Sequence, residues 1–478
     1  MIYFATAVYV LLHSSYAAPP FTPSGNETDF PLVSDIVPFV AGTSDEPCVY
    51  PSQRSVWDIV WGCLATLLAC AWVSVHPNMP KRGESSIKVT ARRLELMIWT
   101  IIAPELIITW AMQQWSGARR LAKKYQKYNW TKTHGHFLQM CGFLLVDEDN
   151  TEQILTPWNL EWFSTQGMVD VPEIPESEIK DRSKGDIFSK TMVLGQTTWF
   201  VVQCIARIMQ GLVLTQLELV TLALAALHAF MFFLWLHKPL AARSPITVRL
   251  RMIRKIKRAV EDSPETIEHD TTSFWAKLFH YFTAQKDHIF KTSPSDNLRP
   301  FKRTYAFIML PTLVILLPII RFADIAGQLF RGRTLTSEGD ITFFAERPIQ
   351  FKSVFLTSGT SFSVAVIFGA IHCAGWYFHF HTPTDAWLWR ISSAVTTATP
   401  LLAAMVFGVP WLMVILSIQS RYTVKILHYV KLAFLFTIPF YIVARLILLG
   451  EALAGMRNLP PSALAAVKWS DFFPHISQ

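Results

Sequence analysis

About seven stretches of this chain are apolar for long enough to cross a lipid bilayer, and this feature limits the possible fold more than any other. A bilayer core about 30 Å thick needs roughly 20 apolar residues in a helix. The predicted crossings are Trp57–Val75, Thr191–Val213, Leu217–Leu236, Thr304–Ile320, Val354–Tyr377, Trp387–Ile418 and Ile426–Leu449. We therefore expect an all-α polytopic membrane protein with about seven transmembrane helices.

The composition supports a membrane protein. Hydrophobic residues make up 51% of the chain and charged residues 16%, against about 25% charged residues in a soluble domain. The net charge of +8 comes from basic blocks beside the apolar runs, where the positive-inside rule places them. The expected partner is therefore the lipid bilayer, with anionic lipid contacted by the basic cluster at 249–258. No nucleic acid and no cofactor is predicted.

The amino terminus is typical of a secreted or membrane protein. Residues 1–18 form a short apolar run followed by small residues, which predicts a signal peptide cut near Ala17 or Ala18; an uncleaved anchor is the alternative. Residues 19–54 predict a disordered extracytosolic tail with a glycosylation sequon at Asn26. We expect an integral membrane glycoprotein of the secretory pathway, in the plasma membrane or an endomembrane, with its N-terminus extracytosolic.

The segment 55–114 holds the first crossing and an ambiguous apolar piece, Leu94–Met112. This piece contains Pro104 and Glu105 and has basic residues on both sides. Since basic flanks favour the cytosolic face, both ends are expected on one side, which predicts a re-entrant or interfacial helix. A true span is the alternative.

The rest of the chain divides by charge and hydropathy. Residues 115–190 predict a soluble insert, and 191–237 a transmembrane hairpin. Residues 238–303 contain fourteen Lys and Arg against seven Asp and Glu, which predicts a basic cytosolic loop. Residues 304–450 then provide four crossings, and 451–478 form a C-terminal tail. Seven crossings with the N-terminus outside predict a C-terminus inside.

One predicted crossing carries a polar stripe with an arginine. Gln196, Gln203, Arg207 and Gln210 lie within roughly 60° of one another at 100° per residue. A guanidinium inside the membrane requires a partner or water, and Glu218, across a short turn, is the expected partner. The stripe predicts either a structural Arg207–Glu218 pair or a polar cavity for a ligand.

Three other charged residues lie in or beside apolar runs. Glu105 follows Pro104, which loosens the helix, so Glu105 could face a cavity or, alternatively, the headgroups. Lys431 and Arg445 are expected to snorkel near the ends of their run.

A cluster of polar residues follows the crossing that ends near Tyr377. Together with nearby Trp and Tyr residues it is typical of an interfacial belt, and its members are only weak candidates for metal ligands because the spacing does not require convergence. The cluster contains His372, His379, His381 and Asp385.

Several sequence pieces carry a family resemblance. They include WVSVHPNMP, RRLELMIWTIIAPEL, WTKTHGHFLQMCGF, the run from IPESEIKDRSKGD to FLWLHKPL, and WSDFFPHIS. In these pieces the chain resembles a widespread family of uncharacterised fungal multi-pass integral membrane proteins, over most of its length from Trp57 onward. The resemblance implies a fungal source and an α-helical membrane fold, and it carries no catalytic residues. Leu236-His237 stands before Lys-Pro where many members have Trp-Asn or Trp-Glu.

The function is expected to depend on the polar interior. Nucleotide-binding, serine-hydrolase and zinc-protease motifs are missing from the sequence. The first hypothesis is a protein that binds or transports a small solute through a polar intramembrane cavity. The alternatives are an intramembrane enzyme acting on a lipid or terpenoid with Glu105 and the histidine cluster as acid/base groups, a seven-helix receptor-like protein, and an adaptor using its basic loops.

Glycosylation tests the predicted topology. We expect a glycan on Asn26, because its sequon is outside, and none on Asn129, because the insert is cytosolic. Enzymatic deglycosylation of wild type, Asn26→Gln and Asn129→Gln measures this as a mobility shift. A shift that disappears in Asn129→Gln contradicts the cytosolic placement of the insert.

Overall fold

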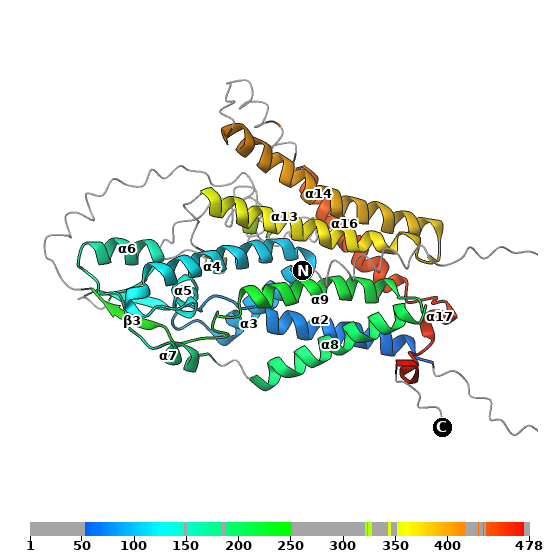
Figure 1. The fold of residues 1–478 in the computed structure, drawn as a ribbon, viewed down its shortest axis with the longest axis horizontal. Helices are drawn as coiled ribbons and strands as arrows, with labels where there is room; N and C mark the ends of the chain where they lie inside the picture. The colour runs from blue at the N-terminus through cyan, green and yellow to red at the C-terminus, as the bar shows by residue number, and fades with distance from the viewer. Residues whose placement is uncertain are drawn as a thin grey trace, which may run out of the picture.

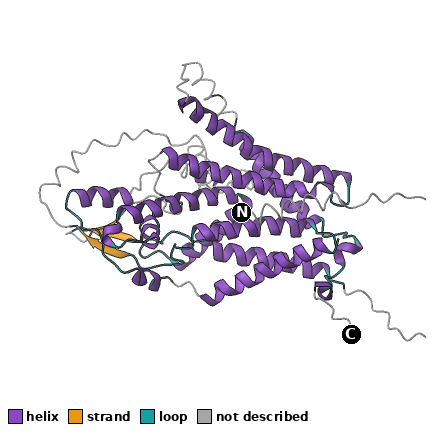
Figure 2. Cartoon of the chain, in the orientation of Figure 1, coloured by secondary structure: helices purple, strands orange, loops and turns teal. Residues whose placement is uncertain are grey.

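The computed structural model describes residues 53–147, 151–183, 187–250, 351–415 and 436–472, together with the short pieces 321–322, 324–326, 343–345, 429 and 434. The signal peptide, the sequon at Asn26, nearly all of the basic loop and the predicted crossing 304–320 lie outside these residues. Figures 1 and 2 show the described chain as a helical bundle with a small sheet-containing insert at one end.

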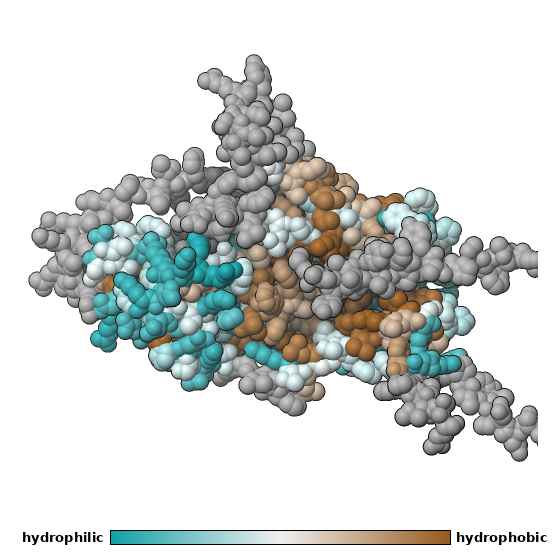
Figure 3. All heavy atoms as spheres, in the orientation of Figure 1, coloured by the Kyte–Doolittle hydropathy of each residue, from teal (hydrophilic) through white to brown (hydrophobic). Residues whose placement is uncertain are grey.

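Long helices make up the bundle. Five of them contain segments long and apolar enough to cross a membrane, or six if one bent pair counts as a span, which is compatible with a membrane location; seven spans stays a prediction. In Figure 3 apolar surface lies over the bundle and hydrophilic surface over the insert. The bundle helices are α2 (Val56–Ser74), α3 (Ser86–Ile102), α4 (Pro104–Lys124), α8 (Ile187–Met209), α9 (Gln216–Leu234), α13 (Phe351–Cys373), α14 (Pro383–Ile415) and α16 (Thr437–Ala454).

Helix α2 shows how sequence sets both the start and the exposed face of a bundle helix. Ser55 and Asp58 form a capping box that fixes its first turn. Trp57 and Trp61, one turn apart, are 77% and 71% exposed. Amphipathic aromatic rings are favoured at a membrane interface, so this face of α2 is suited to lipid.

Helices α3 and α4 are bent by 113° at Ala103. Pro104 begins α4, where its missing N–H costs nothing. Met79, ahead of α3, and Leu121, near the end of α4, lie in the same core of the insert. The bent pair is either a broken span or a re-entrant loop, so both the re-entrant interpretation of Leu94–Met112 and its alternative, a true span, stay predictions.

The insert has its own core. Phe143 stacks on Trp130 and meets the edge of Phe137, and strand β1 pairs antiparallel with β2 and parallel with β3. Since β3 follows α9 in sequence, the folded unit extends beyond the predicted 115–190. Its elements are η1 (Gln126–Tyr128), α5 (Lys132–Gln139), β1 (Phe143–Val146), β2 (Glu152–Ile154), α6 (Pro157–Thr165), α7 (Glu176–Asp181) and β3 (Ile246–Arg249).

The C-terminal segment lies at the opposite end of the bundle, which we call the tail end. It contains α17 (Pro461–Leu464) and η4 (Trp469–Phe472). Gln53 pairs with Ala465, and Arg54 N donates to Leu464 O over 2.8 Å, so the start of α2 and the C-terminal segment are neighbours. This backbone pairing holds residues 53 and 465 at one end of the bundle, whereas the predicted seven crossings would separate the two termini; the side on which each terminus lies stays a prediction.

Tag accessibility tests this pairing. We expect an epitope tag within residues 19–54 and another after Gln478 to react from the same side of sealed vesicles, because Gln53 and Ala465 are paired. A tag at Gly167, in the insert, is the control and should react from the other side. Reaction of the two terminal tags from opposite sides contradicts the observed arrangement.

Candidate functional site

Arg207 is buried in protein at the tail end. It is 1% exposed, and its guanidinium donates to four carbonyl oxygens: Ala465 at 2.7 Å, Val213 at 2.9 Å, Ala463 at 3.0 Å and Ser462 at 3.1 Å. These acceptors offset the cost of removing a charge from water. The prediction that Arg207 turns toward protein is confirmed, and its partners make it an anchor for the C-terminal segment.

Glu218 does not serve as the partner of Arg207. It receives Arg54 in a bidentate ion pair, at 2.5 Å and 3.0 Å, and it also caps the first turn of α9 with Thr215. The predicted Arg207–Glu218 pair is therefore wrong. Arg54 belongs to the segment before α2, which sequence spacing could not place beside α9.

The glutamines of the stripe extend the same contacts. Gln210 binds the backbone of Lys468, with its amide donating at 2.7 Å and its oxygen accepting at 3.1 Å. Gln196 donates to Thr66 of α2 over 3.4 Å, and Gln203 is half-buried. The stripe thus faces α2 and the C-terminal segment, and these contacts favour an anchoring role over a ligand site.

A second buried charge lies in the middle of the bundle. Arg445, on α16, is paired with Glu105, on α4, at 3.1 Å, with side chains 5% and 15% exposed. The guanidinium also lies over the Phe368 ring, 4.1 Å from its centroid. Snorkelling of Arg445 to a helix end is therefore wrong. Its position, ninth among the eighteen residues of α16, was the sequence signal for a buried charge.

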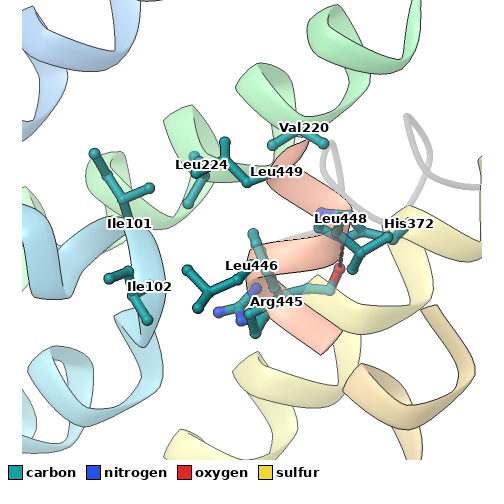
Figure 4. A pocket seen from close by; sticks show the side chains of 10 residues that line it. Ile101, Ile102, Val220, Leu224, His372, Arg445, Leu446, Leu448 and Leu449 are labelled. Atoms are coloured by element: carbon teal, nitrogen blue, oxygen red, sulfur yellow. Dashed lines mark hydrogen bonds between the residues drawn. The ribbon is translucent and has the colours of Figure 1, made fainter. Parts of the chain in front are cut away.

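A small cavity adjoins Arg445. Its enclosed volume is about 20 Å³, which is about the room that one water molecule needs. Figure 4 shows the Arg445 nitrogens on the side of the cavity that faces the end of α3. Apart from Arg445 and His372, the walls are mainly aliphatic. The lining residues include Ile101, Ile102, Val220, Leu224, His372 and Arg445.

The predicted histidine cluster does not converge. His372 is buried, and its Nδ1 contacts Phe368 O at 2.8 Å, whereas His379 and His381 are exposed beyond the end of α13. The carboxylate of Asp385 accepts a hydrogen bond from the backbone N–H of Thr382, at the start of α14. Among the described residues no group of three or more His, Cys, Asp or Glu could hold a metal ion, so the weak metal candidates gain no support.

A third buried cation, Lys238, joins the bundle to the insert. Its ammonium donates to His76 O at 2.5 Å, Gln114 Oε1 at 2.9 Å and Asn78 Oδ1 at 3.0 Å. It also lies over the rings of Trp110 and Trp235, at 4.5 Å and 4.9 Å from their centroids. Three oxygen acceptors and two aromatic faces favour the charged form, whereas burial lowers the pKa of Lys238 well below its usual value.

The same amides hold a distant segment of the chain. The carbonyl of Phe344 accepts from Asn78, Trp110 and Gln114 at 3.1, 3.0 and 2.9 Å. Lys238 therefore orders the side chains that fix residues 343–345. Sequence reasoning missed this role because a lysine directly after an apolar run is normally an exposed flank.

Two histidines near Lys238 are kept neutral by burial. Burial lowers the pKa of His76 to about 3, with the charge of Lys238 contributing, and lowers that of His136 well below its usual value. Both ring nitrogens of His136 are buried without a hydrogen-bond partner. The unfolded chain binds protons at these histidines below about pH 6.5 and the folded chain does not, so stability falls as the pH decreases.

We predict that the melting temperature decreases on acidification from pH 7.5 to 5. Each such histidine contributes up to about 1.4 kcal/mol per pH unit below its unfolded pKa. His136→Leu should reduce this pH dependence, and His381→Gln, at an exposed site, should leave it unchanged. Thermal melts in detergent measure the effect, and an equal slope in wild type and His136→Leu contradicts it.

Comparison with known proteins gives one match. Residues 40–261 and 302–476 match a family described as a family of unknown function, DUF8562. No curated protein and no solved structure matches the chain.

Proposed function

We propose that this chain, which belongs to the DUF8562 family of unknown function, binds a small solute in the intramembrane cavity beside Arg445. The protein either holds this solute or moves it through the bilayer. This moves the hypothesis of a ligand cavity from Arg207 to Arg445. The reason is that all four acceptors of Arg207 are backbone carbonyls of its own chain.

One observation carries the proposal: Arg445, which is paired with Glu105, lies half-way along the candidate span of α16 and lines a cavity. A buried ion pair gives little net stability, since desolvation offsets the attraction. Ionisable residues at such a depth are therefore a functional-site hypothesis by default. A pair that served packing alone has no need of an open space beside it.

The enzyme alternative has less support. It required Glu105 and the histidine cluster to act together. His379 and His381 lie on the surface near the tail end, where His381 contacts Asn458, whereas Glu105 is bound to Arg445 inside the bundle. A catalytic acid/base pair must reach one substrate, so we favour binding.

The remaining features are part of the same proposal. We place the protein in the secretory pathway of a fungal cell, with its N-terminus extracytosolic and glycosylated and its insert in the cytosol. Of the basic cluster at 249–258 the structure describes Arg249 and Leu250, so its contact with anionic lipid rests on the charge pattern alone. A receptor-like role would require the seven predicted spans.

Closing the mouth of the cavity tests the function. Leu446 lines the cavity and is 43% exposed, so Leu446→Trp should block entry without disturbing the core. Leu453→Trp is the matched control, because Leu453 lies two turns further along α16 and is 46% exposed.

We expect at least one small molecule to co-purify with wild type and Leu453→Trp, and to fall about tenfold in Leu446→Trp. Mass spectrometry of solvent extracts, alongside metabolite comparison of deletion and wild-type cells, measures this. If no molecule depends on residue 446, the proposed function is wrong.

A further inference from the structure

Helix α4 passes from the apolar bundle into the insert. Trp115 is half-buried and packs against the core of the bundle, whereas Leu121 and Tyr125 belong to the core of the insert. The surface changes from apolar to hydrophilic between these two parts of the molecule (Figure 3). The edge of a bilayer around the bundle is therefore expected to cross α4 close to Trp115.

The buried ion pair gives a depth scale along α4. Arg445 lies half-way along the candidate span of α16, so its partner Glu105 lies near the middle of the bilayer. From there α4 runs along the bundle beside α9 and α13 (Figure 1). At about 1.5 Å per residue, Trp115, Arg119 and Lys123 lie about 15, 21 and 27 Å from Glu105 along α4.

These depths match the layers of a bilayer. The hydrocarbon ends about 15 Å from the middle, and the headgroups extend to about 21 Å from it. Trp115 therefore lies at the edge of the hydrocarbon, where its ring is favoured. Arg119 lies among the headgroups, and Lys123 lies one turn further out.

Arg119 and Lys123 are exposed cations whose charge the protein leaves free. Within the part of the chain that the structure describes, neither has a carboxylate partner, although the adjacent Lys124 is paired with Glu161. The guanidinium of Arg119 lies over the ring of Trp115, 4.6 Å from its centroid. Side chains of an α-helix lean toward its N-terminus, and α4 begins inside the bundle. Both cations therefore lean toward the bilayer.

Two free cations at this level favour a phospholipid with a net negative charge. A guanidinium donates to two oxygens of one phosphate, and an ammonium adds a point charge beside it. A phosphatidylcholine headgroup also brings a quaternary ammonium, which Arg119 and Lys123 repel. Phosphatidylserine and phosphatidylinositol carry a net negative charge, so the attraction to basic side chains near the membrane surface is not cancelled.

We propose that Trp115, Arg119 and Lys123 form a binding site for the headgroup of an anionic phospholipid, in the leaflet next to the insert. The guanidinium of Arg119 binds the phosphate, the ammonium of Lys123 binds the outer part of the headgroup, and the Trp115 ring packs where the acyl chains begin. This site is separate from the basic cluster at 249–258 and from the cavity beside Arg445.

Photo-crosslinking with matched lipids tests the site. The full chain is placed in phosphatidylcholine vesicles with a trace of phosphatidylserine, or of phosphatidylcholine, that carries a diazirine at the start of one acyl chain. We expect phosphatidylserine to label peptides from residues 104–124 about 25-fold more than phosphatidylcholine, at about fivefold for each cation. Peptides from α16, residues 437–454, are the reference and should be labelled equally by both lipids.

Two double variants assign the effect to these residues. Arg119→Gln with Lys123→Gln should reduce labelling by phosphatidylserine to the level of phosphatidylcholine. Lys127→Gln with Lys180→Gln is the matched control: it removes the same charge from exposed positions of the insert, and Lys127 lies about 33 Å from Glu105 along the chain axis of α4, beyond the headgroups. All four side chains are exposed, so thermal melts should be unchanged.

Four results overturn the proposal. Two are equal labelling of residues 104–124 by both lipids in wild type, and a preference for phosphatidylserine that persists in Arg119→Gln with Lys123→Gln. The third is an equal loss in the control variant, which shows an effect of net charge alone. The fourth is loss of labelling on adding millimolar inorganic phosphate at constant ionic strength, which shows a site for free phosphate. None of these results involves residue 446, so the cavity keeps its own test.

Discussion

Each buried cation of this protein has to find protein groups that replace water, and the described architecture depends on how three of them do so. The three use different partners. Arg207 takes backbone carbonyls, Arg445 takes a carboxylate, and Lys238 takes a carbonyl, two amide oxygens and two indole faces. In each case the partners come from segments far apart in the sequence. The desolvation cost of a charge therefore acts as a constraint that brings those segments together.

The nature of the partners also separates anchoring from function. Carbonyls accept from Arg207 and thereby fix the C-terminal segment. The amides that accept from Lys238 also donate to Phe344 and thereby fix residues 343–345. Arg445 differs from Arg207 and Lys238 in that its side chain borders open space; the Nε atoms of both arginines are buried without a hydrogen-bond partner.

The sequence predicted the parts of the fold that depend on local physics. Apolar length indicated most of the long helices, the proline at position 104 indicated the break between α3 and α4, and the stripe around Arg207 indicated a buried face. The predicted pair of Arg207 and Glu218 was wrong because the prediction relied on proximity along the chain. In the folded protein Arg54 pairs with Glu218, and the C-terminal segment supplies most of the acceptors of Arg207. Arg445 was misread because a flexible basic side chain in an apolar run snorkels unless a carboxylate on another helix holds it.

By itself, the sequence determined that this chain forms apolar helices and that a guanidinium at position 207 must face protein, because hydrophobic burial and charge desolvation act on each residue wherever it lies. Only the tertiary structure decided which partners the charges take, that Gln53 and Ala465 meet at one end of the bundle, and that the cavity lies beside Arg445. Those outcomes depend on contacts between residues hundreds of positions apart, and no local pattern specifies which of several available carboxylates or carbonyls reaches a given cation.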